Sequence, residues 1–275
     1  VLAWVPDFQH RTIPSMFGRL TRWQRDLRLA AQIRSGRTIL LSSEDAQRDC
    51  LRWFPAASGR TVVARFAVPP GDPRPPRKDI AEKYDLPERF IFLPNQFWRH
   101  KNHLGLIEAI ALLKERVPDL CIAASGNPRD VRHPEHFAEV TRRIADLGVE
   151  PAFRMLGFIP YEDVTELMRR ASALINPSFC EGWSSTVEEA KALGVPLILS
   201  SLPVHREQAG DAAMYFDPGS PTAMAASIEE AWCRFDSPGD ANRAWAAVPA
   251  AQARVDAYVH AFLHAADTAM RVGPV

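Results

Sequence analysis

The sequence has 275 residues, of which 47% are apolar and 24% carry a charge. These proportions are ordinary for a folded chain of one or two domains, and they exclude wholesale disorder. Lysine and arginine together number 33, as do aspartate and glutamate, so we expect no nucleic-acid partner.

Cysteine usage and the lack of targeting signals indicate a cytoplasmic protein. The four cysteines stand far apart without a CxxC pair, which is typical of reduced thiols rather than of disulfide or zinc frameworks: Cys50, Cys121, Cys180 and Cys233. No apolar run approaches the ~18 residues of a membrane span, and no leader pattern is visible. The opening VLAWVPDF reads like the interior of a protein, so we expect further residues upstream.

The balanced charge conceals an asymmetry along the chain. Residues 1–78 hold 14 basic and 6 acidic side chains, whereas the rest holds 19 and 27. The change falls at VPPGDPRPPRKD, whose five prolines suit a linker because proline removes amide donors and favours extended backbone. We expect a partial N-terminal domain at 1–70, a hinge at 71–78, a C-terminal domain at 79–235, and a helical segment at 236–275 that crosses back to the N-terminal part.

The first predicted element is a basic helix at 14–34. Four arginines at three-residue steps are interleaved with five apolar residues: Arg19, Arg22, Arg25 and Arg28, with Phe17, Leu20, Trp23, Leu27 and Ile33. A basic amphipathic helix can lie on an anionic membrane surface, which would make the protein peripheral there. The alternative is a solvated basic face on a helix that packs through its apolar side.

Short apolar runs then alternate with helical periodicity. Strands are expected at 38–43, 61–68, 90–94, 120–124, 153–156, 173–176, 196–200 and 213–216. Helices are expected at 102–116, 134–147, 161–170, 184–193, 222–235 and 240–270. This alternation predicts an α/β fold with a doubly wound parallel sheet, whose ligands bind beyond the carboxyl ends of the strands. We expect the last helix to pack back under the hinge through one face, made of Val255, Val259, Phe262 and Leu263.

One segment carries chemistry that the others lack. Residues 176–201 read NPSFCEGWSSTVEEAKALGVPLILSS, a strand, loop, helix and strand with Glu181 in the loop and Glu189 eight positions later. A helix start with free amides and hydroxyls suits a phosphate, and the two carboxylates can accept hydrogen bonds from sugar hydroxyls. The alternative is structural, because Ser185 with Glu188 and Thr186 with Glu189 both fit a capping box. Signatures for dinucleotides, P-loops, zinc peptidases and serine hydrolases are absent, and we expect no metal.

Three ordered motifs resemble glycosyltransferase family 4, the retaining nucleotide-sugar enzymes of GT-B fold. EGWSSTVEEAKALGVPLILSS resembles the family's E-x7-E element, although it departs at Trp183, Ser184 and Ser185. LPNQFWRHKNHLGLIEAI (93–110) resembles its strand, basic loop and helix, and LGFIPYEDVTELMRRASALINPS (156–178) its glycine, helix and next strand. The resemblance covers roughly 90–218 and implies a Rossmann-type donor domain at 79–235 beside a partial acceptor-side domain.

The resemblance also implies roles for individual residues. Glu181 matches the glutamate beside the donor hexose, and Glu189 the one that binds the nucleotide ribose. Arg99 and Lys101 fall where the family places its basic pair on the diphosphate, although His100 stands between them. Fixed cations there would stabilise the charge of the departing nucleoside diphosphate; a solvated basic loop is the alternative.

Further residues are expected to line the donor site. Gly182, Trp183, Ser184, Ser185 and Thr186 belong to the loop and helix start, and Asn95, Gln96, Gly126, Asn127 and Gly157 follow the neighbouring strands. The glycines would let backbone approach the nucleotide, or are plain turn glycines. We expect Trp98 to pack rather than to stack on a ligand.

The N-terminal part offers one catalytic candidate. His10 in PDFQH, and after it Asp7, lie near the place where the family carries a catalytic-site His-Asp pair, although Pro6 occupies the histidine's usual place. The family's glycine-rich acceptor loop has no counterpart, so we expect an incomplete acceptor side, with self-association or slow transfer as the result.

The resemblance implies transfer of a sugar from a nucleotide diphosphate sugar to a hydroxyl acceptor, with retention at the anomeric carbon and no cofactor. The acceptor would be a polysaccharide, a lipid-linked glycan or another glycan. Two alternatives stay open, a non-catalytic nucleotide-sugar-binding domain and a GT-B-like nucleotide-sugar epimerase.

Overall fold

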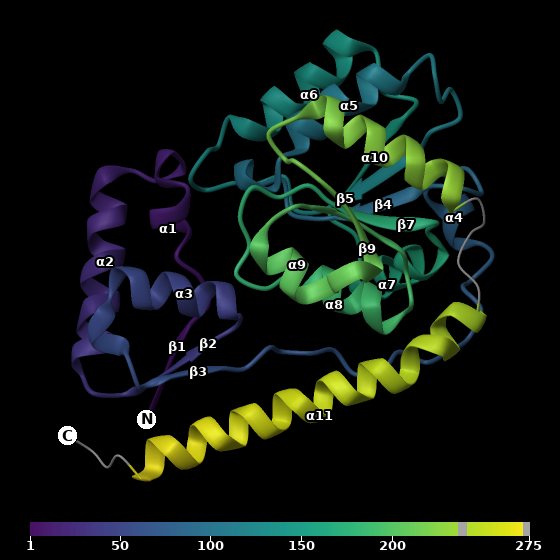
Figure 1. Cartoon of the computed structure of the whole chain (residues 1–275). Helices are drawn as coiled ribbons and strands as arrows, with labels where there is room; N and C mark the ends of the chain where they lie inside the picture. Colours follow the sequence, from purple (N-terminus) through teal and green to yellow (C-terminus); the bar gives the residue numbers. More distant parts are fainter. Residues whose placement is uncertain (236–240, 272–275) are drawn as a thin grey trace.

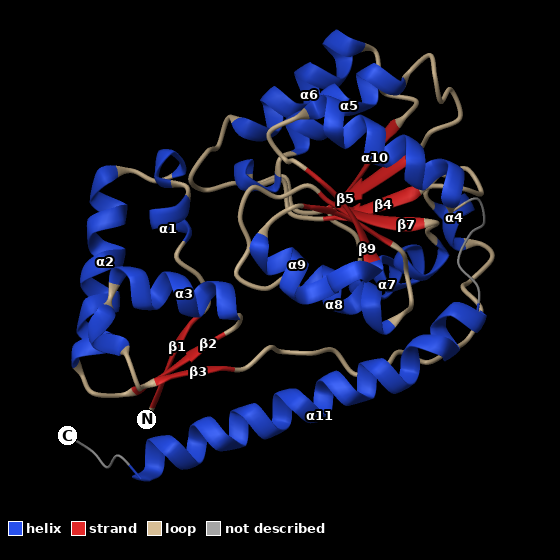
Figure 2. Ribbon diagram, in the orientation of Figure 1, coloured by secondary structure: helices blue, strands red, loops and turns tan. Residues whose placement is uncertain are grey.

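The computed structural model describes residues 1–235 and 241–271 and contains two parallel β-sheets flanked by helices (Figure 1, Figure 2). The small sheet has the order β1-β2-β3, from β1 (Leu2–Val5), β2 (Thr38–Leu41) and β3 (Thr61–Val63). Its helices are α1 (Gln9–Thr12), α2 (Arg19–Arg34) and α3 (Glu44–Trp53), with 3-10 turns at Pro14–Met16 and Pro55–Ala57. The expectation of two strands here is wrong, because the opening residues form β1 and pair with β2.

The large sheet has the order β6-β5-β4-β7-β8-β9. Its strands are β4 (Ile91–Pro94), β5 (Ile122–Ser125), β6 (Phe153–Gly157), β7 (Ala173–Asn176), β8 (Leu197–Ser200) and β9 (Ala213–Phe216). The six strands expected beyond the hinge are confirmed within two residues at each end. The chain runs outward from β4 to β6 and then returns to place β7 on the other side of β4. This reversal opens a crevice at the carboxyl ends of β4 and β7, where such sheets bind ligands.

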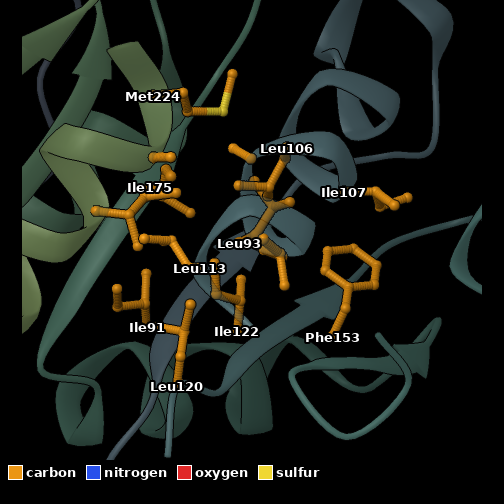
Figure 3. Close-up of a cluster of buried hydrophobic side chains, with 14 of the residues drawn as sticks. Ile91, Leu93, Leu106, Ile107, Leu113, Leu120, Ile122, Phe153, Ile175 and Met224 are labelled. Carbon is orange, nitrogen blue, oxygen red and sulfur yellow. The ribbon is translucent and has the colours of Figure 1, made fainter. Parts of the chain in front are cut away.

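Alternate residues of the strands enter two separate cores. On β4, Ile91 and Leu93 face a core under α5 (His103–Leu113), α6 (His136–Leu147) and α10 (Pro221–Arg234), part of which is drawn in Figure 3. Phe90 and Phe92 face the core under α4 (Ile80–Lys83), α7 (Tyr161–Arg170) and α8 (Ser185–Ala192), and α9 (Pro203–Ala209) lies beside α8. Because helices cover both faces, the strands read as continuous apolar runs.

The last helix, α11 (Ala241–Arg271), crosses back to the small sheet (Figure 1). It contacts α8 and all three strands of that sheet. The side expected to pack is wrong: Val259, Phe262 and Leu263 are 46%, 41% and 59% exposed. The helix packs instead through Ala251, Tyr258, Ala261 and Ala265, because small alanine side chains let it lie close to its neighbours. Of the expected segment 236–275, residues 236–240 and 272–275 lie outside the described residues.

Candidate functional site

A cavity of about 280 Å³ lies at the carboxyl ends of β4 and β5, beside the start of α8. Its lining includes five residues that the sequence assigned to the donor site: Gln96, Gly126, Ser185, Thr186 and Glu189. Phe158 and Tyr161, which the sequence analysis did not select, complete its rim and are 76% and 62% exposed. A larger hollow of about 730 Å³ lies beside the proline-rich segment and α4, and it contains none of the candidate residues.

Glu189 faces this cavity, and the capping-box alternative is not formed. The hydroxyl of Tyr161 donates to Glu189 Oε1 at 3.2 Å. Burial raises the pKa of Glu189, and the Tyr161 hydrogen bond partly offsets that rise. Helix α8 begins at Ser185 with no side-chain cap, and the carboxylate of Glu188 is bound elsewhere, by Lys191, Gln208 and Arg254. The first amides of α8 therefore remain available for a ligand.

Glu181 and Lys101 form a buried ion pair next to the helix start. Lys101 Nζ lies 2.6 Å from Glu181 Oε1, and the two side chains are only 11% and 8% exposed. Burial by itself would raise the pKa of Glu181, but Lys101 and the hydroxyl of Ser178 outweigh it and hold the pKa at about 2. Glu181 is thus a carboxylate at any physiological pH.

A hydrogen-bond network links this ion pair to the cavity. Asn176 Nδ2 donates to Ser184 Oγ at 3.1 Å and approaches Glu181 Oε1 at 3.4 Å. Ser184 Oγ in turn lies 3.1 Å from the hydroxyl of Thr186, which lines the cavity. Asn95 supports the network by donating to Asn176 Oδ1 at 3.3 Å. Asn176 and Ser178 were missed from the sequence, although both directly follow or end a predicted strand.

The side chains of Arg99 and Lys101 lie in different surroundings, because the short 3-10 turn Arg99–Lys101 directs them differently. Lys101 is buried against Glu181, whereas Arg99 is exposed and uses its backbone N–H to bond Asp130 at 3.1 Å. His100 between them is buried, and burial together with Lys101 lowers its pKa to about 4. Arg132 lies beside His100 and over Trp98, with 5.8 Å from its guanidinium carbon to the ring centroid. Trp98 is 37% exposed, so the expectation that it packs holds only in part.

Several expected site residues also hold loops together. Trp183 is buried and donates its Nε1–H to the carbonyl of Phe66 at 2.9 Å. Gln96 accepts the backbone N–H of Asn127 at 2.7 Å. A Cβ on Gly126 would lie 2.2 Å from the carbonyl oxygen of Asn95, so this glycine permits close loop packing. Gly157 has φ +72° and open space around it, which fits a turn glycine.

The N-terminal residues reach the Glu181 loop, and His10 and Asp7 have separate partners there. His10 is buried with Nε2 at 2.9 Å from Asp26, while Asp7 accepts the backbone N–H of Gln9. Burial lowers the pKa of His10, and Asp26 opposes that shift. A Cβ on Gly182 would lie 2.2 Å from the carbonyl oxygen of Pro6, so residues 6–7 lie directly against this loop.

Comparison with known proteins assigns the family. Residues 76–232, more than half of the chain, match the family described as glycosyl transferases group 1. The chain belongs to this family. Among the residues that the structure describes, this group 1 chain has no cluster of three His, Cys, Asp or Glu side chains suited to a metal ion, and no helix long and apolar enough to cross a membrane.

Curated relatives of the group 1 chain are longer than it is. It is 28% identical over 203 residues to O-antigen chain mannosyltransferase B of Escherichia coli, which covers 70% of this chain and 51% of that protein. It is 32% identical over 202 residues to D-inositol 3-phosphate glycosyltransferase of Corynebacterium glutamicum (strain R), covering 69% and 47%. The chain therefore spans about half the length of these relatives.

Solved structures identify the fold of the group 1 chain as GT-B. Anabaena HepE in complex with UDP and glucose gives a TM-score of 0.75 at 19% identity, covering 97% of this chain and 70% of HepE. A glycosyltransferase from Rickettsia africae ESF-5 gives 0.70 at 21% identity, covering 83% and 62%. The expected GT-B-like α/β fold with parallel sheets is confirmed.

Proposed function

We propose that the chain binds a nucleotide diphosphate sugar and, as a retaining enzyme of glycosyltransferase family 4, supports transfer of its sugar to a hydroxyl acceptor. The observation that carries this proposal is that two features lie next to each other at the edge of the large sheet where the strand order reverses. One is the cavity formed by Glu189 and the uncapped start of α8, and the other is the buried Glu181–Lys101 pair.

Each part of a donor has a matching group. Glu189 would accept hydrogen bonds from the ribose hydroxyls, and the exposed rings of Phe158 and Tyr161 offer surfaces for the base. The amides at the start of α8, together with Lys101, would hold the diphosphate. The hexose would then lie near Glu181. HepE, whose structure holds UDP and glucose, supports a nucleotide donor.

The chemistry follows from where charge develops. When the bond between the anomeric carbon and the phosphate oxygen breaks, the leaving nucleoside diphosphate gains negative charge. Lys101 is held in place by Glu181 and would stabilise that charge where water is largely excluded. The proposal assigns no protein nucleophile: an oxygen of the leaving phosphate takes the proton of the acceptor hydroxyl, which attacks from the same face and retains the configuration. The positive charge of Lys101 and of the helix start replaces a metal in this scheme.

Calorimetric titration with UDP-, GDP- and ADP-hexoses, followed by product analysis, tests the proposal. We expect one nucleotide class to bind, Glu189→Ala to weaken it, and Glu162→Ala to leave it unchanged, since Glu162 is an exposed carboxylate next to Tyr161 on α7. With a hydroxyl acceptor, the product should keep the anomeric configuration of the donor. Turnover of the donor without acceptor would indicate an epimerase, and binding without any turnover a non-catalytic module. No nucleotide binding would refute the proposal.

A further inference from the structure

Helix α2 presents an apolar stripe to solvent. Its sixteen residues include a single buried one, Ile33. Leu20, Trp23 and Leu27 are 66%, 60% and 47% exposed, and their spacing of three and four places them on one face. We call these three residues the α2 stripe. Of the five apolar residues in this segment, only Phe17 and Ile33 are buried, so the alternative of a helix that packs through its apolar side holds for these two alone.

The α2 stripe points away from the body of the protein. Leu29 and Ile33 pack into the core of the small sheet. At about 3.6 residues per turn, Leu20 and Leu27 lie on the side of the helix opposite Leu29, whereas Trp23 lies only about 80° around the helix from Ile33. Figure 1 shows α2 at the outer edge of the small sheet, far from the large sheet and from α11.

Cations border the α2 stripe. Arg19 and Arg28 fall on its two flanks, and Arg34 lies at its end. These three arginines are exposed and form no ion pair or side-chain hydrogen bond with another described residue. Asp26, the one acidic residue of α2, lies one turn after Trp23, but its carboxylate is bound by His10 and Arg11. The exposed face of α2 is thus apolar along its centre, with unpaired arginines beside it and its one carboxylate paired.

We propose that α2 docks on an anionic membrane surface. Leu20, Trp23 and Leu27 would enter the boundary between headgroups and acyl chains, while Arg19, Arg28 and Arg34 bind lipid phosphates. An apolar centre with basic flanks is the arrangement of interfacial helices, in which long arginine side chains reach back to the headgroups and tryptophan favours the interface. A second copy of the chain fits poorly, because two α2 faces would bring like charges together. Docking would bring the cleft to a lipid-linked acceptor, and this part rests on the proposed function.

Vesicle co-sedimentation of the whole chain tests the docking directly. We expect binding to vesicles of phosphatidylcholine with phosphatidylglycerol, little binding to phosphatidylcholine alone, and weakening as salt rises. The variant Leu20→Ser/Trp23→Ser/Leu27→Ser should lose roughly tenfold or more in partitioning. The separate variant Arg19→Gln/Arg28→Gln should lose most of the preference for anionic lipid.

The chain supplies a closely matched control on α11. Trp245, Val259 and Leu263 are also one tryptophan and two aliphatic residues, with exposures of 62%, 46% and 59%. Their triple replacement by serine should leave vesicle binding unchanged. Equal loss in both triple variants, or equal binding to neutral and anionic vesicles, would overturn the proposal. A concentration-dependent dimer, seen by light scattering, would also overturn the proposal if the triple α2 variant abolished the dimer while vesicle binding persisted. Donor affinity measured without vesicles reports separately on the proposed function.

Discussion

The ammonium group of Lys101 and the carboxylate of Glu181 are held 2.6 Å apart by two segments 80 residues distant in sequence, with both side chains largely shielded from water. Lys101 ends a 3-10 turn after β4, and Glu181 belongs to the loop after β7. These are the two central strands on either side of the reversal, so the ion pair joins the two halves of the large sheet at the crevice.

Acid should remove the stabilising effect of this ion pair. The pKa of Glu181 is about 2 in the folded protein against an ordinary value of 4.5. Its contribution to the free energy of unfolding is therefore present above pH 4.5 and is lost as the pH falls toward 2. We expect Glu181→Gln to flatten the loss of stability across that interval, measured by urea unfolding at several pH values. Glu162→Gln should keep the wild-type profile, and an unchanged profile for Glu181→Gln would contradict the prediction.

Lys101→Ala should reduce turnover more than donor affinity. Charge on the leaving diphosphate grows toward the transition state, and losing one fixed partner there costs about 10²–10³ in kcat. Arg99→Ala should have a much smaller effect, because Arg99 is exposed and lies outside the ion pair. Lys101→Ala also leaves the buried carboxylate of Glu181 without its cation, which should lower stability. The double variant Lys101→Ala/Glu181→Gln removes both charges, so a loss of turnover that persists in it does not come from that instability. Normal kcat in Lys101→Ala would refute the role.

Glu189→Ala should weaken nucleoside diphosphate binding by about 1–3 kcal/mol, the scale of hydrogen bonds to a charged group. Thermal stability should change little, because the Glu189 side chain caps no helix and its carboxylate bonds only the hydroxyl of Tyr161 among the described residues. Calorimetry and a melting curve on the same sample check both statements. A lower Tm with unchanged affinity would instead favour a structural role.

Tyr161→Phe should weaken the same binding by about 0.5–1.5 kcal/mol, the net value of one hydrogen bond. The hydroxyl of Tyr161 fixes Glu189 Oε1, so the loss should vanish when Glu189 is already alanine. A double-mutant cycle with nucleotide and its 2′-deoxy analogue measures this coupling. Additive losses would mean that Tyr161 acts independently of Glu189.

The sequence predicts the large sheet well because its strands are covered on both faces and read as unbroken apolar runs. Strand β1 escapes this pattern, since Trp4 is 60% exposed and the run is only four residues long. The sequence also does not indicate which side of α11 packs, because alanines supply its contacts and larger apolar residues face solvent. Periodicity alone does not distinguish these two sides.

For the candidate site, the motifs and their family resemblance predict Glu181, Glu189 and Lys101 but not the contacts that hold these side chains. The bond between His10 and Asp26 depends on α2 folding back beside α1, which no local motif reports. Tyr161 reaches Glu189 from another helix, and the amide of Asn176 links the loop after β4 to the loop after β7. Such contacts between distant segments need the assembled fold.

Helix α8 sets a lower limit on how far the protein can be trimmed. One of its sides lines the cavity through Ser185, Thr186 and Glu189, while Glu188 on another side is fully buried and bound by Arg254 of α11 at 3.1 Å. A version cut to residues 76–232, the stretch that matches the family, would strip a cation from that carboxylate. Lys191 and Gln208 would still bind Glu188 in that version. We therefore expect α11 to add stability to the ligand-binding helix, and the trimmed stretch to unfold more readily than the whole chain.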